Sequence, residues 1–496
     1  MGARDDALRR LETESFDLLV VGAGIHGASA AWTAARLGLK TALIDAGDFG
    51  AATSANSLKV IHGGLRYLQH GNFKRMRESI LARRRFLQLA PALLRPQAFA
   101  IPTRGWGVRS RMALRAALWV NDLVSFDRNY GVNKTHQLPC GRILSRREAA
   151  ELWPLLPAAS YDGAALWYDA LAHDIERLTL AFALSASWRG AAVANYVRAV
   201  RILESGGAVS GVLARDEIAD AEFAIGARAV LNAAGPWWKT WCGRRGREHP
   251  LVGAWNLVVR KRWFGSIGVG LESRQEHLDP DALIQRGRRN LFFVPWREGT
   301  MVGTVYEPYS GDPADYRPSP GSIEAFIREI NAVLPGAGLE AADITLLHIG
   351  VQPASTAGGS PEPDKHSEIQ ADALRGLFHI KGVKYTTGLS VGETAARRIA
   401  RMLGVGNSAI QEDALIGAEP LAGDLRAQTR RAVEHEFAVR LSDVVIRRTG
   451  LGTFSRPPDS EIECMATEMA RILDWSAVRL KQELELLEQD FRWFRP

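Results

Sequence analysis

The sequence predicts an α/β protein that opens with a β-α-β unit, and three observations support this fold class. A short apolar run, Phe16–Val21, has the composition of a buried parallel strand. It leads directly into the glycine-rich segment Gly22–Gly27, and the alanine-rich stretch that follows has helical composition up to Gly38. A second apolar run, residues 40–44, ends in Asp45, 18 residues after Gly27.

The glycines at 22, 24 and 27 have the spacing of a dinucleotide-binding turn, G-x-G-x-x-G. Gly22 allows the tight turn, Gly24 lets backbone amides approach a pyrophosphate, and Gly27 lets the helix pack closely on the strand. The helix N-terminus supplies partial positive charge, and Asp45 can accept hydrogen bonds from a ribose. A glycine-rich turn without a ligand is the plainer interpretation, but it needs neither the two strands nor the acid. We therefore expect a bound dinucleotide.

The residues after this unit favour a flavin over a nicotinamide dinucleotide. No repeating β-α pattern follows; instead come the small polar side chains of Thr53–Ser57 and the glycines of the segment 59–67. Small groups suit a chain that must pass close to a second, flat part of the cofactor, and an isoalloxazine ring fits that description.

Several motifs in the right order resemble the aerobic, FAD-dependent glycerol-3-phosphate dehydrogenases over nearly the whole chain. The strongest match is TSANSLKVIHGGLRYLQHGNF, residues 53–73. Further matches are LNAAGPW (231–237), FVPW (293–296), GT (303–304), GDP (311–313), KYTT (384–387) and LSDVVIRRTGLGTFSRP (441–457).

The resemblance implies three parts: an α/β chain with an α+β cap and a helical tail. The first is an FAD-binding Rossmann-like domain of the glutathione-reductase and D-amino-acid-oxidase type, assembled from residues 14–90, 160–245 and 345–405. The second is an inserted substrate-binding β-sheet domain, residues 91–159 and 246–344. The third is a C-terminal helical domain, residues 406–496. The sequence by itself agrees, with strands predicted at 191–195 and 374–382 and a helix over 391–403.

The resemblance also implies the residues that meet the cofactor and the substrate. Phosphate anchoring in this family comes from basic side chains, which match phosphate oxygens. The expected catalytic or substrate residues are His62, Arg66, Tyr67, Asn256, Gln352 and Lys384. The expected FAD contacts are Gly22, Gly24, Ile25, His26, Gly27, Asp45, Ala46, Thr53, Ser54, Ser57, Lys59, His62, Gly63, Gly64, Val193, Ala234, Gly235, Trp237, Gly350, Gly382, Val383, Lys384, Tyr385 and Thr386.

Two positions depart from the family pattern. Where the family reads K-G-S-H, this chain has Asn256, and where the family reads G-V-R-P, it has Gln352. Asn cannot act as a base near neutral pH, and Gln cannot neutralise a phosphate as Arg does. A family arginine in the following loop corresponds loosely to Lys365 or His366. An intact enzyme needs a replacement base, and His62 is a candidate.

These departures leave three functions open. One is oxidation of a secondary alcohol, glycerol 3-phosphate or a related phosphorylated polyol, by hydride transfer to FAD, with quinone or oxygen as the electron acceptor. Another is oxidation of a different alcohol or an amine in specialised metabolism. The last is a flavin-binding protein without catalysis. The expected substrate is small and anionic in the first case.

Other motifs favour other classes less. Residues 388–392 read G-x-S-x-G, a nucleophile-elbow pattern around Ser390 with Asp413 and His435 following, but the preceding residues are too polar for the buried strand that a hydrolase requires. No histidine pair has metal-ligand spacing, so no metal is expected. The arginine run 83–85 is more typical of a solvated helix face than of a nucleic-acid site.

Residues 104–124 predict an amphipathic helix in which arginines alternate with aromatic and aliphatic side chains. Such a helix can lie on an anionic membrane surface, as the peripheral membrane enzymes of the family do, or it can pack inward against the substrate domain. The sequence leaves both arrangements open.

Composition sets the remaining expectations. Three scattered cysteines and a net charge of +7 favour a reducing cytosol and argue against a disulfide scaffold or a nucleic-acid protein. The polar first residues and the lack of a long apolar run predict neither a secretory signal nor a transmembrane helix. The expected location is the cytoplasm, including the inner face of its membrane for a peripheral member. The oligomeric state, a homodimer included, stays open.

Overall fold

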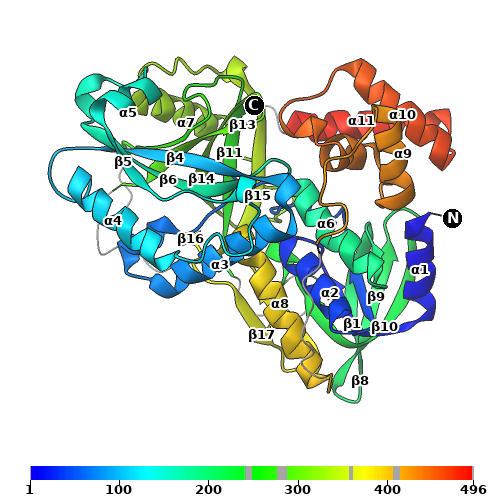
Figure 1. Ribbon diagram of the computed structural model, residues 1–496. Helices are drawn as coiled ribbons and strands as arrows, with labels where there is room; N and C mark the ends of the chain where they lie inside the picture. The colour runs from blue at the N-terminus through cyan, green and yellow to red at the C-terminus, as the bar shows by residue number, and fades with distance from the viewer. Residues whose placement is uncertain are drawn as a thin grey trace.

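Two β-sheets and a helical region organise the chain (Figure 1). The computed structural model describes residues 2–239, 241, 249–275, 288–356, 361–405 and 414–493, and every structural statement below refers to these residues.

The first sheet has a parallel centre in the order β18-β10-β1-β2-β7, with antiparallel β17 beyond β18. Strand β9 pairs with β10, and β8 with β9. The bounds are β1 Ser15–Val21, β2 Thr41–Ile44, β7 Ala192–Ala194, β8 Val197–Ser205, β9 Ala208–Asp216, β10 Ala221–Asn232, β17 Glu368–Ala371 and β18 Leu377–Lys381.

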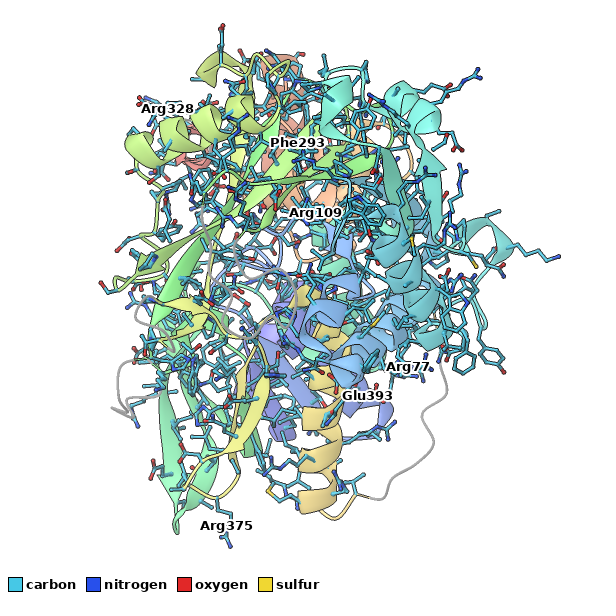
Figure 2. All side chains as sticks on the ribbon, turned by 90° about the vertical axis from the view of Figure 1, so that its left-hand side faces the viewer. Arg77, Arg109, Phe293, Arg328, Arg375 and Glu393 are labelled. Atoms are coloured by element: carbon cyan, nitrogen blue, oxygen red, sulfur yellow. The ribbon has the colours of Figure 1, made fainter. Side chains whose placement is uncertain are left out.

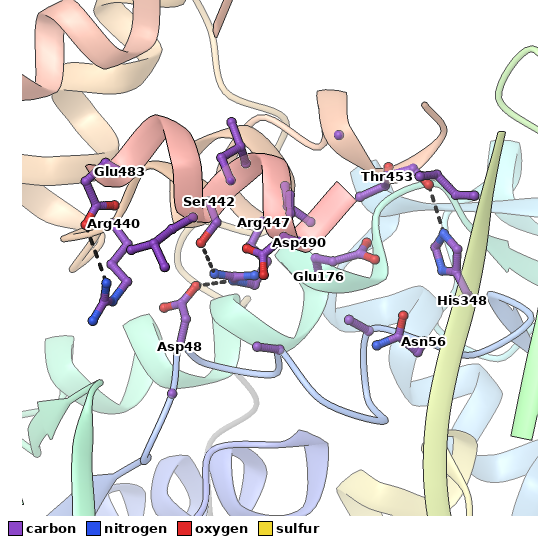
Figure 3. A pocket seen from close by; sticks show the side chains of 18 of the residues that line it. Asp48, Asn56, Glu176, His348, Arg440, Ser442, Arg447, Thr453, Glu483 and Asp490 are labelled. Carbon is purple, nitrogen blue, oxygen red and sulfur yellow. Dashed lines mark hydrogen bonds and ion pairs between the residues drawn. The ribbon is translucent and has the colours of Figure 1, made fainter. Parts of the chain in front are cut away.

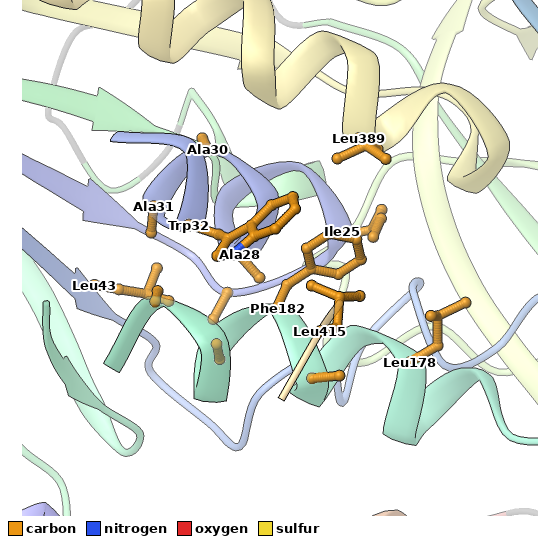
Figure 4. Close-up of a cluster of buried hydrophobic side chains, with 14 of the residues drawn as sticks. Ile25, Ala28, Ala30, Ala31, Trp32, Leu43, Leu178, Phe182, Leu389 and Leu415 are labelled. Carbon is orange, nitrogen blue, oxygen red and sulfur yellow. The ribbon is translucent and has the colours of Figure 1, made fainter. Parts of the chain in front are cut away.

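Helices cover this sheet because alternate residues of β1 are apolar on both faces. Leu18 and Val20 join the core beneath α2 (Ile25–Arg36), α6 (Ile175–Trp188) and α8 (Tyr385–Met402), whereas Leu19 and Val21 face α1 (Ala3–Thr13) and the β8–β9 region. Helix α2 lies against α6, where the rings of Trp32 and Phe182 meet edge to face at 5.4 Å (Figure 4). Truncating a buried aromatic side chain of this kind to alanine costs about 3–5 kcal/mol.

The second sheet has the order β16-β15-β11-β14-β13-β12-β4-β6-β3, with β5 paired to β6. Trp255 of β11 packs on one face beneath α7, and Val258 of the same strand faces the C-terminal region. Figure 2 shows Arg328 on the outside of α7 and Phe293 among the strands below. The bounds are β3 Val60–Ile61, β4 Leu94–Thr103, β5 Arg142–Ser145, β6 Gly163–Ala172, β11 Leu251–Val259, β12 Gly268–Glu272, β13 Asn290–Trp296, β14 Gly299–Tyr309, β15 Ile344–Ser355, β16 Glu362–Pro363, α5 Arg146–Leu152 and α7 Pro320–Val333.

The C-terminal region is helical, with α9 (Leu425–His435), a π-helical turn over 443–448, α10 (Asp459–Leu473) and α11 (Ala477–Trp493). Buried ion pairs tie it to the first domain. Arg448 donates from Nη2 to Asp48 at 2.9 Å, and Arg177 of α6 donates to Glu436 at 2.7 Å. Although burial opposes ionisation, the arginines keep the pKa of both carboxyl groups below their usual values. Removing one partner of such a pair would leave an uncompensated buried charge.

Sheet membership differs from the sequence-based partition. Residues 160–172 and 345–355 are predicted in the FAD-binding domain, but β6 and β15 are strands of the second sheet, as is the short β3. The sequence pattern shows that these segments are apolar and extended, whereas their sheet is decided by long-range hydrogen bonding. Helix α8 also begins at Tyr385 rather than at Val391, because contacts with α2 override the low helix propensity of its two glycines.

Candidate functional site

The glycine turn between β1 and α2 leaves no room for side chains. Gly22 has a φ of +97°, and a Cβ atom there would lie 2.6 Å from the carbonyl oxygen of Ala233. A Cβ atom on Gly27 would lie 1.8 Å from the carbonyl oxygen of Gly22. The turn is therefore packed against the end of β10, where Ala234 and Gly235 follow. This proximity brings two of the glycine segments predicted to hold the cofactor into one place.

Helix α2 and helix α8 point their N-terminal ends into the same region. Gly24 caps α2 and Lys384 caps α8. A Cβ atom on Gly388 would lie 2.7 Å from the side chain of Ile25, and one on Gly392 would lie 2.3 Å from the Oγ of Ser29. The α8 glycines therefore allow the two helices to cross closely. Their adjoining N-termini provide the partial positive charge that an anionic cofactor group prefers.

Asp45 stands at the carboxyl end of β2, as a ribose-binding acid requires. Its Oδ2 accepts a hydrogen bond from the N–H of Ala23 at 2.6 Å, and its Oδ1 accepts one from Gly47 at 2.9 Å. Burial raises the pKa of Asp45 to about 6. Ala46 follows Asp45, and Val193 lies on the neighbouring strand β7 opposite Leu43. These residues form a continuous edge beside the glycine turn.

The segment 53–54 lies between α2 and the second sheet. The N–H of Ile25 donates to Ser54 Oγ at 3.0 Å, and Thr53 Oγ1 donates to the carbonyl oxygen of Val351 at 2.7 Å. A Cβ atom on Gly350 would lie 3.0 Å from Thr53. A cavity of about 180 Å³ opens here, lined among others by Thr53, Gly350 and Trp237, whose Nε1 donates to Asp312 at 3.0 Å.

The residues present fit a flavin dinucleotide. One buried ring nitrogen, His26 Nε2, makes no hydrogen bond within the described part of the chain, and the ring of His26 lies within 2.6 Å of where a Cβ atom on Gly382 would be. Burial lowers the pKa of His26 to about 4, so its ring is neutral and can donate or accept. The glycine turn at 22–27, the acid predicted to bind a ribose, two helix N-termini and a buried nitrogen without a hydrogen bond among the described residues therefore meet in one region.

The start of α8 also brings together the side chains of Lys384, Arg75, Arg66 and Lys365, which come from separate segments of the sequence and form a cationic cluster. Lys384 Nζ donates to Tyr67 Oη at 2.5 Å and lies 4.6 Å from the centre of the Tyr67 ring. The guanidinium carbon of Arg75 lies 4.7 Å from the same ring centre, and Arg75 donates to the carbonyl oxygen of Lys365. Burial, and next the charges of Arg75, Arg66 and Lys365, lower the pKa of Lys384 to about 7.

Arg75 is the residue of this cluster that sequence reasoning missed. It lies in the first turn of α3 (Phe73–Leu89), where the side chain of Asn72 caps the helix by accepting from the N–H of Arg75 at 3.0 Å. An Asn before an amphipathic run is a sequence signal for a helix start, so the N-cap at Asn72 could have been predicted. The helix start places Arg75 in the first turn of α3, beside the Tyr67 ring.

His62 is close to the cationic cluster. Its ring centre lies 6.1 Å from that of Tyr67, and its backbone N–H donates to Thr386 Oγ1 at 3.4 Å. Burial, followed by the charge of Lys384, lowers the pKa of His62 to about 4. The adjoining glycines serve the packing here. A Cβ atom on Gly63 would lie 2.4 Å from the guanidinium of Arg83, and Gly64 has a φ of +79°.

Asn256 and Gln352 lie on one face of the second sheet. Asn256 of β11 pairs with His348 of β15, and Val252 of β11 pairs with Gln352 of β15. The two pairs are four residues apart on each strand, and side chains alternate between the faces, so Asn256 and Gln352 share a face. Asn256 is buried, and its Oδ1 accepts from Thr304 Oγ1 at 2.7 Å. Gln352 is half-buried. Neither side chain can supply the base or the positive charge of the family pattern.

Three further predicted cofactor residues are engaged by protein groups. The Lys59 ammonium forms a fully buried ion pair with Glu176 at 2.5 Å, and the backbone N–H of Lys59 donates to Ser57 Oγ at 3.3 Å. The Tyr385 hydroxyl is hydrogen-bonded to Thr179 at 2.9 Å. Val383 donates its backbone N–H to Ser367 at 3.2 Å. These contacts place the Lys59 and Tyr385 side chains in the supporting structure around the glycine turn.

A larger cavity, of about 450 Å³, lies between the loop 47–56 and the C-terminal region (Figure 3). Glu176, His348, Arg447 and Asp490 line it, but none of the predicted catalytic or substrate residues does. This cavity is therefore separate from the cationic cluster.

The structure does not support the hydrolase pattern around Ser390. Ser390 lies inside α8 rather than on a strand-to-helix turn, and the glycines beside it serve the contact with α2, so the hydrolase pattern lacks its required context. Asp413 lies outside the described residues. Among the residues described, no group of three or more His, Cys, Asp and Glu side chains could hold a metal ion.

The predicted amphipathic helix forms over a shorter range, as α4 (Arg111–Val124). One face packs inward, where Leu114 and Leu118 join the core beside β6, and the opposite face is exposed. Met112 is 77% exposed, Trp119 68% and Leu123 59%, and Leu118 is its buried residue. In the part of the chain that the structure describes, none of the helices combines the length and apolarity needed to cross a bilayer.

The fold and the glycine turn are those of a dinucleotide-binding protein, and comparison with known proteins identifies its class. Residues 17–402 match the family of FAD dependent oxidoreductases. The chain is 31% identical to a glycerol-3-phosphate dehydrogenase of Synechocystis sp. over 78% of its own length and 70% of the relative's. It is 33% identical to one of Mycobacterium leprae, over 77% and 63% of the two lengths.

Solved structures agree on the fold. A glycerol-3-phosphate dehydrogenase from Bacillus halodurans, complexed with FAD, has a TM-score of 0.75 at 22% identity and covers 100% of this chain and 98% of its own. An L-alpha-glycerophosphate oxidase from Mycoplasma pneumoniae with FAD bound has a TM-score of 0.55 at 15% identity, over 82% and 98% of the two chains.

The chain therefore belongs to the FAD-dependent oxidoreductases and, within them, to the glycerol-3-phosphate dehydrogenase family. The predicted family, fold class, cofactor and oxidoreductase activity are confirmed. The individual site residues and the domain boundaries stay predictions. The chain spans 63% to 70% of the length of the two curated relatives.

Proposed function

We propose that this chain oxidises the secondary alcohol of a small phosphorylated polyol, such as glycerol 3-phosphate, to a ketone. The observation that carries the proposal is the cationic cluster around Tyr67 at the start of α8, beside the glycine turn. A dense group of cations favours a substrate with a negative charge. The names of the relatives denote the same substrate class.

FAD, when bound, accepts the hydride from the substrate carbon. The residues that would hold it are the glycine turn at 22–27, Asp45, the 53–54 segment, Ala234–Gly235, Gly350 and the segment 382–386. The residues of the cationic cluster then bind the substrate, hold its hydroxyl near Tyr67, and receive the hydroxyl proton.

Lys384 is the best-suited proton acceptor of the three candidates. Asn256 has no basic nitrogen. His62 is neutral near pH 7, but its pKa of about 4 gives it little affinity for the proton. The pKa of Lys384 is about 7, near the range in which general bases work best. Its N–H group donates to Tyr67 Oη, which leaves the lone pair of the neutral amine for the substrate hydroxyl.

Anaerobic flavin reduction tests the proposed substrate class. The holoenzyme is mixed with glycerol 3-phosphate, with glycerol, and with a panel of amines and amino acids, and bleaching of the flavin band is followed. We expect rapid bleaching by glycerol 3-phosphate and at least about 100-fold slower bleaching by glycerol, which lacks the charged-group contacts. Bleaching by an amine alone would assign the alternative reaction. No bleaching by any donor would favour a non-catalytic flavoprotein.

We further propose that α4 rests on an anionic membrane surface, with quinone as the electron acceptor and oxygen as the alternative. The exposed apolar stripe at 112, 119 and 123 is flanked by the exposed Arg111 and Arg115, a combination that suits acidic lipid headgroups. Trp106 and Phe126, which flank the helix, are 95% and 79% exposed.

Vesicle flotation tests this surface. We expect binding to vesicles of phosphatidylglycerol, little binding to phosphatidylcholine, and roughly tenfold weaker binding of a Met112→Ser/Trp119→Ser variant. Trp188→Ser is the matched control, because Trp188 is 66% exposed on a different helix. Equal flotation of the double variant and the wild type would exclude α4 as the contact.

A further inference from the structure

Arg75 lies at the centre of the cationic cluster. Its charge favours lower pKa values at four neighbouring groups, Lys384, His62, Tyr67 and His366. Burial is the larger effect at each: it lowers the pKa of the lysine and of both histidines, and it raises that of Tyr67. These groups come from three separate segments of the chain, so the Arg75 guanidinium is near all of them.

The position of Arg75 is fixed from two sides. The Asn72 side chain accepts a hydrogen bond from the backbone N–H of Arg75. The Arg75 side chain lies over the Tyr67 ring and donates to the carbonyl oxygen of Lys365. A guanidinium has five N–H donors in a rigid plane, so a group anchored in this way can still present donors to an oxyanion. The arrangement also ties the Lys365–His366 loop to α3.

The charges near this cluster are mostly of one sign. Arg66, Arg75 and Lys365 are cations, as is Lys384 while it is protonated, and the carboxylates of Glu78, Glu368 and Asp169 act on the same groups with the opposite sign. Like charges held this close repel one another, and a bound anion would relieve the repulsion. The cluster therefore has the electrostatics of an anion-binding site before substrate arrives.

We propose that Arg75 supplies the anion-binding charge that Gln352 lacks. The charged end of the substrate then lies against Arg75 and Lys365, on the α3 side of Tyr67, rather than against β15. This inference rests on the proposed function, and it makes Arg75 the residue that selects a phosphorylated substrate. It also divides the labour within the cluster, because Lys384 is left to receive the hydroxyl proton.

Binding of inorganic phosphate to the holoenzyme tests the site without turnover. Isothermal titration is carried out on the wild type and on Arg75→Gln, which removes the charge and keeps the length of the side chain. We expect phosphate affinity to fall about 10- to 100-fold, as for the loss of a charge-assisted contact. Lys74→Gln is the matched control, because it removes the same charge from the exposed neighbouring position, and its affinity should change less than about twofold.

Kinetics supply a second readout. In Arg75→Gln, we expect the KM for glycerol 3-phosphate to rise at least about tenfold while kcat changes less, because the residue binds the charged end and does not touch the reacting carbon. Arg75→Lys keeps a charge without the planar group and should fall between the two. If Arg75→Gln fails to retain FAD, the charge-retaining variant carries the test, with a two- to tenfold loss of phosphate affinity expected.

The outcomes separate this inference from the proposed function. Phosphate affinity of Arg75→Gln within twofold of the wild type would overturn the role of Arg75 even if glycerol 3-phosphate were a good substrate. Loss of phosphate binding in this variant, with no alcohol oxidised by the wild type, would support the anion site and refute the proposed reaction.

Discussion

The cofactor cradle and the substrate cluster differ in how far apart their residues lie along the chain. The cradle begins as a local unit in which Gly22, Gly27 and Asp45 act within one β-α-β segment. The substrate cluster joins Lys384 to Tyr67 across 317 residues and Arg75 to Lys365 across 290. In the local unit, the geometry of one short segment restricts which residue each position can hold. In the long-range cluster, a cation from one segment can take the place of a cation from another, provided that both segments lie near the same point.

The comparison predicts that the cradle tolerates change least. In Gly27→Ala, the added methyl would lie 1.8 Å from the carbonyl oxygen of Gly22. We expect loss of bound FAD and a fall of more than about 3 kcal/mol in the free energy of unfolding. Flavin absorbance after gel filtration and the melting temperature measure both.

Gly47→Ala is the matched control, because its nearest neighbour, an oxygen of Asp45, would be 3.9 Å from the new Cβ atom. It should keep FAD and stay within about 0.5 kcal/mol of the wild type. A Gly27→Ala protein that stays yellow and stable would break the distinction between the two regions.

The next largest effect is expected at Lys384. Replacing it with Met should lower kcat by about 10²–10⁴-fold, because the hydroxyl proton loses its acceptor. Lys384→Arg keeps the positive charge but cannot accept a proton near pH 7, so it should lose kcat and retain KM. Stopped-flow flavin reduction gives both constants. A loss confined to KM in both variants would make Lys384 a binding residue only.

The pH dependence sharpens the assignment. Lys384 must be neutral to accept a proton, and its pKa is lowered to about 7, so kcat/KM should rise with pH up to about 7 and level off above it. A bound anion raises the pKa of a neighbouring amine, so the corresponding rise in kcat should lie at higher pH. A limb near pH 4 instead would point to His62, whose pKa is about 4.

The smallest effect is expected from restoring the family pattern. The double variant Asn256→His/Gln352→Arg puts back the imidazole and the guanidinium on the face of the second sheet. If the charge and the base have moved to Arg75 and Lys384, turnover of glycerol 3-phosphate should change less than about tenfold. A rise of about 100-fold, measured by flavin reduction, would show instead that the substrate has drifted from glycerol 3-phosphate.

The local parts of this protein could be predicted from the sequence. The strand, glycine turn, helix and acid over 16–45 form as expected, because apolar periodicity and the glycine spacing act within a few turns of chain. A helix was also predicted over 104–124, and it forms over 111–124. The sequence left open whether its apolar face is exposed or packed inward, because a pattern does not show what covers it.

Tertiary structure decided the rest. The sequence by itself predicted a dinucleotide-binding fold. It also showed that Asn256 cannot act as a base and that Gln352 cannot supply a positive charge, the roles expected at these positions. Only the folded structure shows that Arg75 lies over the Tyr67 ring and that Lys59 forms a buried ion pair with Glu176. It also shows that β15 belongs to the second sheet. The physical reason is that charge, burial and hydrogen bonding act through space, and residues hundreds of positions apart share them only after folding.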